Sequence, residues 1–227
     1  MNPAWKRCPE WDLKLAAGLQ TELVGHPVVA LDEVPSTNDV VKELALQGAP
    51  DGLAVVASHQ SAGRGRRGRT WVACPGQAVY LSVLLRPDWP VGEVTLLGVL
   101  GGVACADAAA ELGVANLLIK WPNDVLARGR KLGGVLVEPR LGEEKIDFAV
   151  VGIGFNVAQQ EADWPDELRA TATSCLAEGC RVTCDEVILA LLRSLDRWYR
   201  PQAELRRAEL LAAWSRWSGT ERLPQLD

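Results

Sequence analysis

The stretch Gly63-Arg64-Gly65-Arg66-Arg67-Gly68-Arg69-Thr70-Trp71 separates two apolar runs of the chain. Leu53 to Ser58 before it and Val79 to Leu85 after it are rich in aliphatic residues, which predicts two buried strands. The glycines let the backbone of the stretch approach a ligand closely, and arginine pairs bidentately with phosphate and carboxylate. The pattern predicts an anion-binding loop between two strands, with a solvated basic loop as the alternative.

The charge of the whole chain argues against a nucleic-acid surface. The 227 residues contain 24 Lys and Arg against 29 Asp and Glu, which gives a net charge of -5. Proteins that bind nucleic acid non-specifically rely on a broad electropositive field, and this chain lacks one. The basic loop is therefore a local device in a chain whose composition, 48% hydrophobic and 23% charged, is typical of a globular protein.

Several further functions and locations are disfavoured. The longest apolar run, Val94 to Ala106, is shorter than the roughly 20 residues that span a bilayer, and the start of the chain lacks a signal-peptide pattern. We expect no membrane contact and a cytoplasmic location, where the six scattered cysteines would stay reduced. Only His26 and His59 are present, so a Ser-His-Asp hydrolase is poorly supported and a metal-dependent or substrate-assisted transfer is favoured.

Helices and strands are expected to alternate around the loop. Ser36 and Asp39 are spaced as a capping box that opens a helix ending near Gly48, and Thr183 with Glu186 repeats that signal before the C-terminal helix. The other expected elements are a buried helix at 94–112, strands at 117–121, 133–138 and 148–153, and a helical piece at 205–214 after a break at Pro201. This order predicts an α+β or α/β sheet domain at 28–200, with a lead-in at 1–27 and a short helical tail at 201–227.

Three further segments carry polar residues at predicted strand ends. They are Lys120-Trp121-Pro122-Asn123-Asp124, Lys131-Leu132-Gly133-Gly134-Val135-Leu136-Val137-Glu138 and Gly152-Ile153-Gly154-Phe155-Asn156-Val157. Proline favours a turn, which would fix Lys120 relative to Asp124. Each segment alone is a weak signal, because solvated lysines, a turn-forming aspartate or asparagine and a core tryptophan at Trp71 explain the same residues.

Together, in this order, the segments resemble the catalytic domain of biotin protein ligases, from about Val29 to Trp198. The family's motifs appear here as Ser36-Thr37-Asn38, Gln60 with Gly63 to Gly68, Lys120 to Asp124 and Lys131 to Glu138. Four ordered motifs are far more specific than any one of them. The resemblance implies an α+β fold like that of class II aminoacyl-tRNA synthetases, with a mixed sheet packed against helices.

The resemblance also implies an activity, its cofactors and its partner. Such an enzyme joins biotin to ATP, with Mg²⁺, as biotinyl-5'-AMP and transfers the biotin to a lysine of a biotin carboxyl carrier protein. Adenylation brings two anions together, so cations must neutralise them and hold them in line.

Roles for individual residues follow from the resemblance. The implied catalytic residues are Arg64, Arg66, Lys131 and Asp124. The implied biotin contacts are Ser36, Thr37, Asn38, Gln60, Gly63, Arg64, Lys131 and Gly134. ATP or adenylate is assigned to Arg66, Trp71, Lys120 and Asn156, and Mg²⁺ to Asp124. The arginine loop, as we call residues 63–71, is expected to order over the adenylate and shield it from water.

Two departures from larger family members leave alternatives open. The residues before Val28 are too few for a helix-turn-helix domain, so we expect the monofunctional class and no DNA binding. After Pro201 the helical pattern stands where the family usually has a small β-barrel domain. Alternative functions are therefore a non-catalytic protein that binds biotin or biotinyl-AMP and a ligase for lipoate. The acceptor carboxylase and the oligomeric state stay open, and a homodimer is one option.

Overall fold

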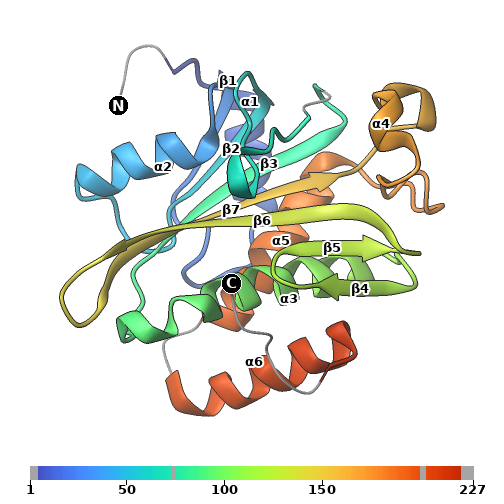
Figure 1. Cartoon of the computed structure of the whole chain (residues 1–227). Coiled ribbons are helices and arrows are strands. Elements are labelled where there is room, and N and C mark those ends of the chain that lie inside the picture. The colour runs from blue at the N-terminus through green and yellow to red at the C-terminus, as the bar shows by residue number, and fades with distance from the viewer. Residues whose placement is uncertain (1–4, 73–74, 200–202, 221–227) are drawn as a thin grey trace.

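The computed structural model describes residues 5–72, 75–199 and 203–220, and its centre is a seven-stranded sheet (Figure 1). The strands are β1 (Val28–Val34), β2 (Ala54–Gln60), β3 (Ala78–Leu85), β4 (Leu117–Lys120), β5 (Asp124–Ala127), β6 (Arg130–Leu141) and β7 (Ile146–Asn156). Their order across the sheet is β1-β2-β3-β7-β6-β5-β4. β1 and β2 are parallel and all other neighbours are antiparallel, so the predicted mixed sheet of an α+β fold is confirmed.

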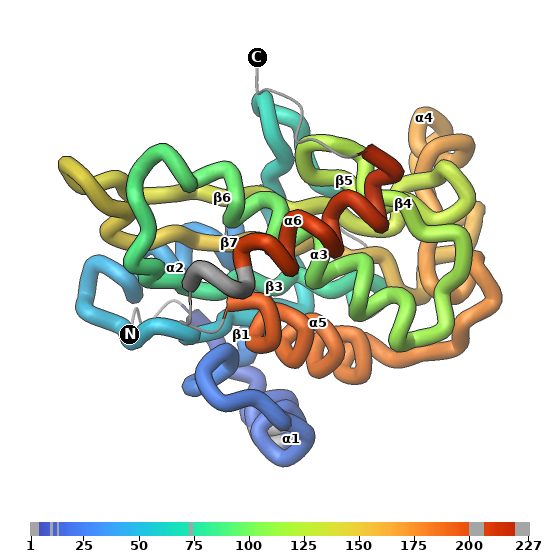
Figure 2. The backbone as a smooth tube through the Cα atoms, turned by 90° about the horizontal axis from the view of Figure 1, so that it is seen from below, coloured from blue at the N-terminus to red at the C-terminus, as the bar shows by residue number. Residues whose placement is uncertain are grey.

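Helices cover both faces of the sheet unequally (Figure 2). They are α1 (Pro9–Gly18), α2 (Thr37–Leu46), α3 (Thr95–Glu111), the short α4 (Asp166–Arg169), α5 (Cys184–Tyr199) and α6 (Ala203–Ser218). Short 3-10 turns occur at Arg66–Gly68, Val91–Glu93 and Glu161–Asp163. α3 and α5 pack on one face, with α6 against α3 and β4, while α2 packs alone on the opposite face over β2, β3 and β7. We call the face that carries α2 the outer face.

Alternation along the strands produces two hydrophobic cores. In β2, Ala54 and Val56 join the larger core under α3 and α5, whereas Val55 and Ala57 join the smaller core under α2. This is the two-residue period of a strand that is buried on both faces. The small core ends where α2 begins, so the outer face beyond that point is left to be covered by the arginine loop.

Most sequence-based expectations for the elements are confirmed. The helices expected from Ser36, Val94 and Thr183 are α2, α3 and α5, and the expected strands appear in β2, β3, β4, β6 and β7. At α5 the capping box forms, because Thr183 donates its backbone N–H to Glu186 at 2.7 Å and accepts from the Glu186 N–H at 3.4 Å. The expected break at Pro201 and one of the cysteines, Cys74, lie outside the described residues.

Four details differ from the expectations, and one of them is β1, a strand that was not expected. Ser36 does precede α2, but its side chain makes no capping bond. The Asp39 carboxylate bonds Arg64, so the expected capping box is wrong. The helix α1 was missed; only part of it faces the core, through the fully buried Leu15. The four-residue strand β5 was missed because it follows directly on the Trp121–Asp124 turn.

The apolar character of α3 is explained by its burial. Residues 91–111 are long and apolar enough to cross a membrane by length and composition alone. In the structure, α3 packs against the sheet, α5 and α6, and most of its side chains are buried in the larger core.

A carboxylate on α3 fastens two other helices. Asp107 accepts hydrogen bonds from the indole N–H groups of Trp198 on α5 and Trp217 on α6, both at 2.8 Å. Asp107→Ala would leave both donors without this acceptor, so we expect the free energy of unfolding to fall by about 2–3 kcal/mol. Urea unfolding followed by tryptophan fluorescence measures this. Asp88→Ala removes an exposed partner of Lys145 and should unfold at the wild-type urea concentration; equal midpoints for both variants would contradict the prediction.

Candidate active site

The outer face carries a flat surface made by two glycines and a tryptophan. Gly134 on β6 and Gly154 on β7 are paired across the sheet, and the Trp71 ring lies against both. A Cβ at Gly154 would lie 2.4 Å from Trp71 Cε2, and one at Gly134 would lie 3.1 Å from Trp71 Cζ3. Only residues without a Cβ admit the ring at this depth.

The even-numbered residues of β7 show how the sequence shapes this surface. Phe148 and Val150 fill the small core under α2. Gly152 and Gly154 follow on the same face, where the Asn38 side chain and the Trp71 ring take the space. The change from large residues to glycine therefore converts a packed core into a floor for other side chains.

A lysine and an aspartate stand beside the tryptophan. Lys131 Nζ lies 5.2 Å from the centre of the Trp71 ring, within range of a cation–π contact, and 2.7 Å from Asp124 Oδ1. The hairpin of β4 and β5 places Lys120 opposite Asp124, as the proline turn predicted. Lys120 itself is exposed. Lys131 is thus a cation held next to the flat surface.

The backbone of Lys131 is fixed by the chain after β7. Its N–H donates to Thr171 O at 2.7 Å, and its carbonyl accepts from the Thr173 N–H at 2.9 Å. The buried Asn156 donates to Thr173 O at 2.9 Å and to Lys131 O at 3.3 Å. Asn156 therefore supports Lys131 in this structure, and its expected contact with adenine stays a prediction.

The first turn of α2 is a second centre of polar contacts. Gln60 Oε1 accepts from the Thr37 N–H at 2.7 Å and lies 3.0 Å from the Thr37 hydroxyl. The buried Ser82 hydroxyl donates to Asn38 Oδ1 at 2.6 Å and lies 2.7 Å from Thr37 Oγ1. Asn38 Nδ2 in turn donates to Glu138 Oε2 at 2.6 Å. Ser36 is also buried here, so the structure brings the predicted biotin contacts of α2 and Gln60 together.

Two carboxylates next to this turn are held ionised. The Arg64 guanidinium bonds Asp39 through both nitrogens, at 2.6 and 2.7 Å, and these bonds lower the pKa of Asp39. Burial alone would raise the pKa of Glu138, but hydrogen bonds from Lys42 and Asn38 outweigh it, so this pKa also lies below its usual value. Arg64 Nη2 reaches Glu138 at 3.5 Å.

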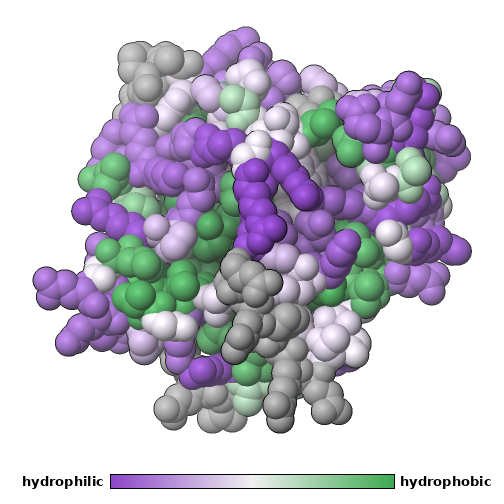
Figure 3. Space-filling model, in the orientation of Figure 1, coloured by the Kyte–Doolittle hydropathy of each residue, from purple (hydrophilic) through white to green (hydrophobic). Residues whose placement is uncertain are grey.

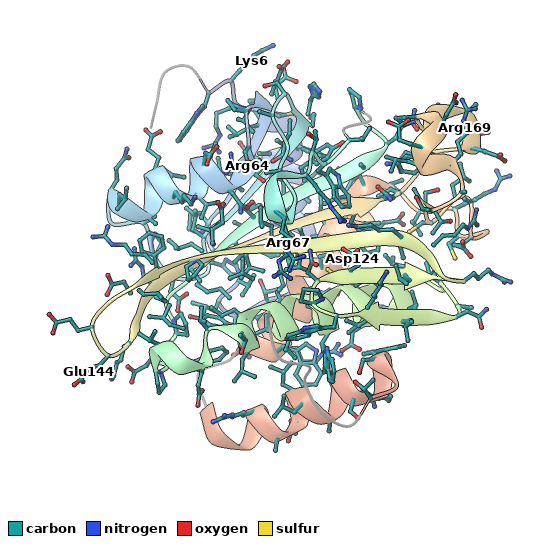
Figure 4. The ribbon with its side chains drawn as sticks, viewed as in Figure 1. Lys6, Arg64, Arg67, Asp124, Glu144 and Arg169 are labelled. Atoms are coloured by element: carbon teal, nitrogen blue, oxygen red, sulfur yellow. The ribbon has the colours of Figure 1, made fainter. Side chains whose placement is uncertain are left out.

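The arginine loop folds back on itself over the outer face. Gly65 N–H donates to Arg69 O at 2.7 Å, and Trp71 N–H donates to Gly63 O at 3.0 Å. A Cβ at Gly63 would lie only 3.1 Å from both Gln60 and Trp71, so glycine permits this approach. Arg67 adopts a left-handed conformation with φ 56°. In Figure 4, Arg64 lies toward α2, and Arg67 lies toward Asp124 on β5.

The loop also borders a cavity of about 220 Å³. Its lining includes Arg66, the start of α3, the turn at 121–123 and residues 135–137 and 139 of β6. Figure 3 shows strongly hydrophilic side chains across the centre of this face, with hydrophobic areas on both sides. An anion with an apolar group attached matches this cavity, because Arg66 provides donors and most of the other lining side chains are apolar.

A magnesium ion fits the site only together with a substrate. Among the described residues, no group of three or more His, Cys, Asp or Glu side chains is arranged to hold a metal. Asp124 is partly exposed, and only its Oδ1 is bonded to Lys131. Mg²⁺ commonly binds one or two carboxylates plus substrate phosphates and water, so Asp124 is suited to provide one ligand.

The sequence did not single out Asp39, Lys42, Ser82 or Glu138 as site residues. Ser82 carried a signal, since a serine hydroxyl in a fully buried strand must find a hydrogen-bond partner. Glu138 ends the motif that begins at Lys131, but its partners Asn38 and Lys42 on α2 lie 96 to 100 residues earlier in the chain.

Comparisons with known proteins agree on one family. A model described as the biotin/lipoate A/B protein ligase family matches residues 30–156. The bifunctional ligase/repressor BirA of Bacillus subtilis is 40% identical over 184 residues, which cover 81% of this chain and 57% of that protein. The biotin--[acetyl-CoA-carboxylase] ligase of Mycobacterium tuberculosis is 40% identical over 167 residues, covering 71% and 59%. This chain thus spans less than two thirds of the length of these relatives.

Solved structures give the same result. The biotin protein ligase of Aquifex aeolicus in complex with biotin and ATP aligns with a TM-score of 0.63 and 34% identity, over 75% of this chain and 68% of that one. The biotin protein ligase of Leishmania major in complex with biotinyl-5-AMP aligns with a TM-score of 0.67 and 25% identity, over 88% and 85%.

Proposed function

The chain belongs to the biotin/lipoate A/B protein ligase family, and on this premise we propose that it is a biotin protein ligase. The proposed reaction has two steps. A carboxylate oxygen of biotin attacks the α-phosphorus of ATP, which forms biotinyl-5'-AMP and releases pyrophosphate. The amine of an acceptor lysine then attacks the carbonyl carbon of the anhydride, which forms an amide and releases AMP and a proton.

The position of Lys131 carries this proposal. Its ammonium group lies 5.2 Å from the centre of a flat aromatic face and is bonded to a single carboxylate, Asp124. A carboxylate and a phosphate can both be placed against this cation while a ring lies on Trp71. Fixed cations lower the cost of bringing two anions together, because they need no reorganisation when the charge moves.

The other residues have supporting roles in the proposal. The buried polar cluster of Ser36, Thr37, Asn38 and Gln60 binds the polar head of biotin in this proposal, with Gly63 and Gly134 allowing close approach. Arg66 and Lys120 add positive charge for the anions, and Trp71 and Asn156 serve the adenine. Asp124 would hold Mg²⁺, which when bound neutralises charge on the phosphates.

The acceptor and the location follow from the same family. Relatives named biotin--[acetyl-CoA-carboxylase] ligases point to the carrier protein of a biotin-dependent carboxylase as the acceptor. We propose a cytoplasmic enzyme with no role for DNA or membranes, in which residues 28–200 form the catalytic domain and a homodimer is an option.

A two-part assay tests the function. Purified protein is given ATP, Mg²⁺ and biotin, and pyrophosphate is measured without acceptor; a purified carrier domain is then added and biotin transfer is followed by mass. Both products are expected. Formation of the adenylate without transfer would support the first step of the proposal and reject the carrier domain as the acceptor. Activity with lipoate instead of biotin, or biotin binding without pyrophosphate, would replace the proposal by one of its alternatives.

Arg66→Ala is expected to increase leakage of the adenylate about tenfold, because Arg66 is the part of the loop that lines the cavity and its side chain would help to exclude water. Leakage is measured as AMP released in the absence of acceptor. Arg140→Ala is the control, since Arg140 is an exposed arginine that pairs with Asp147 on the β6–β7 hairpin. Equal leakage from both variants and the wild type would exclude Arg66 from this role.

A further inference from the structure

Three consecutive residues of α2 each hold a different part of the site. Thr37 bonds Gln60 at the end of β2, Asn38 bonds Glu138 on β6, and Asp39 bonds Arg64 in the arginine loop. A movement of this one helical turn would therefore change the contacts of Gln60, of Glu138 on the sheet and of Arg64 in the loop. The three contacts form one connected network, since Glu138 also lies within 3.5 Å of Arg64.

Arg64 differs from the other arginines of the loop. Its guanidinium faces two carboxylates, and a bidentate pair of this kind fixes both distance and orientation. Within the described part of the chain, Arg66, Arg67 and Arg69 form no ion pair. The loop thus has one arginine neutralised by the protein and three that are available to a ligand.

We propose that Arg64 is a positioning residue, which fastens the arginine loop to the first turn of α2 through Asp39 and couples loop closure to ligand binding at the polar cluster of Thr37 and Gln60. This rests on the proposed function for the identity of the ligand, biotin. It assigns contact with the reacting anions to Arg66 and Lys131 and removes Arg64 from that contact. Because Asp39 is used for this bond, it is also unavailable to cap α2.

Limited proteolysis tests the anchor without any catalytic activity. Trypsin cleaves after the arginines of the loop, and the rate of cleavage after Arg66, Arg67 and Arg69 reports how often the loop opens. In the ligand-free protein, Asp39→Asn is expected to raise this rate about three- to tenfold, and Asp39→Glu to restore most of the protection. Glu43→Gln alters a partly exposed acid of the same helix, whose partner is Gln47, and should leave the rate unchanged.

A double-mutant cycle isolates the pair. If the Asp39–Arg64 bond is the anchor, Asp39→Asn combined with Arg64→Gln opens the loop no faster than either single change. Biotin should slow cleavage of the wild type more strongly than cleavage of Asp39→Asn. The variant has lost the Asp39–Arg64 bond, which connects the polar cluster at Thr37 and Gln60 to the loop. Additive effects in the cycle, or equal protection by biotin in both proteins, would overturn the proposal.

Kinetics separate positioning from direct contact. If Arg64 only positions the loop, the two variants Asp39→Asn and Arg64→Gln behave alike. Both show the same change in the KM for biotin and the same change in the kcat of pyrophosphate release. If Arg64 touches the reacting anions, Arg64→Gln lowers kcat far more than Asp39→Asn, which sinks the proposal. A wild type that releases no pyrophosphate but shows the proteolysis pattern would reject the proposed function and keep the anchor.

Discussion

Lys131→Ala is expected to slow pyrophosphate release from ATP and biotin by about thirty- to a thousandfold, which corresponds to about 2–4 kcal/mol of transition-state stabilisation. Lys131 is held from two sides, by Asp124 at 2.7 Å and by the hydrogen bonds of its own backbone to residues 171 and 173. A cation fixed in this way stabilises the charge that develops between the two anions without first having to be ordered.

The experiment needs a lysine control and a test of folding. Lys145→Ala removes a lysine that pairs with Asp88 near the β6–β7 hairpin, and it should keep wild-type rates. Lys131 is partly exposed, with no more than 35% of its side chain accessible, and its removal should leave the urea midpoint close to that of the wild type. A Lys131→Ala enzyme that adenylates biotin at more than about a third of the wild-type rate would show that the reacting anions are neutralised elsewhere.

The sequence predicted the elements that local patterns specify. α3 was predicted by its long apolar run, β2 and β3 by aliphatic runs, and α5 by a capping box that does form. The resemblance to biotin protein ligases added what no local pattern contains, namely that four separated motifs belong to one site. The comparisons confirm that family and fold.

The remaining features depend on contacts between distant segments. Asp39 has the spacing of a capping residue, yet a bidentate bond to Arg64, 25 residues away, takes its carboxylate. Glu138 and Ser82 acquire their roles only when α2 is packed across the sheet. Local spacing states which bonds a side chain is able to make, and tertiary packing decides between them.

The glycines of the outer face belong to this second group, because their function depends on a ring delivered by a different loop. Glycine is needed at position 154 so that the Trp71 ring can keep its place. A Cβ at Gly154 would lie 2.4, 2.7 and 2.8 Å from three atoms of the Trp71 indole ring. Real Cβ contacts at such distances do not occur, so the ring must move away from the sheet, and it takes with it the surface below Lys131.

We therefore expect Gly154→Ala to lower kcat/KM for adenylation about a hundredfold, the size of loss that a misplacement of roughly 1 Å in an active site causes. Gly134→Ala, with its nearest contact at 3.1 Å, should lose about tenfold, and Gly102→Ala in α3, with 3.5 Å, should keep full activity. Pyrophosphate release gives the rates, and near-ultraviolet circular dichroism reports the environment of the tryptophans. The order of the three losses must follow the three distances. If Gly154→Ala adenylates biotin as well as Gly102→Ala, the Trp71 surface is not part of the reacting site.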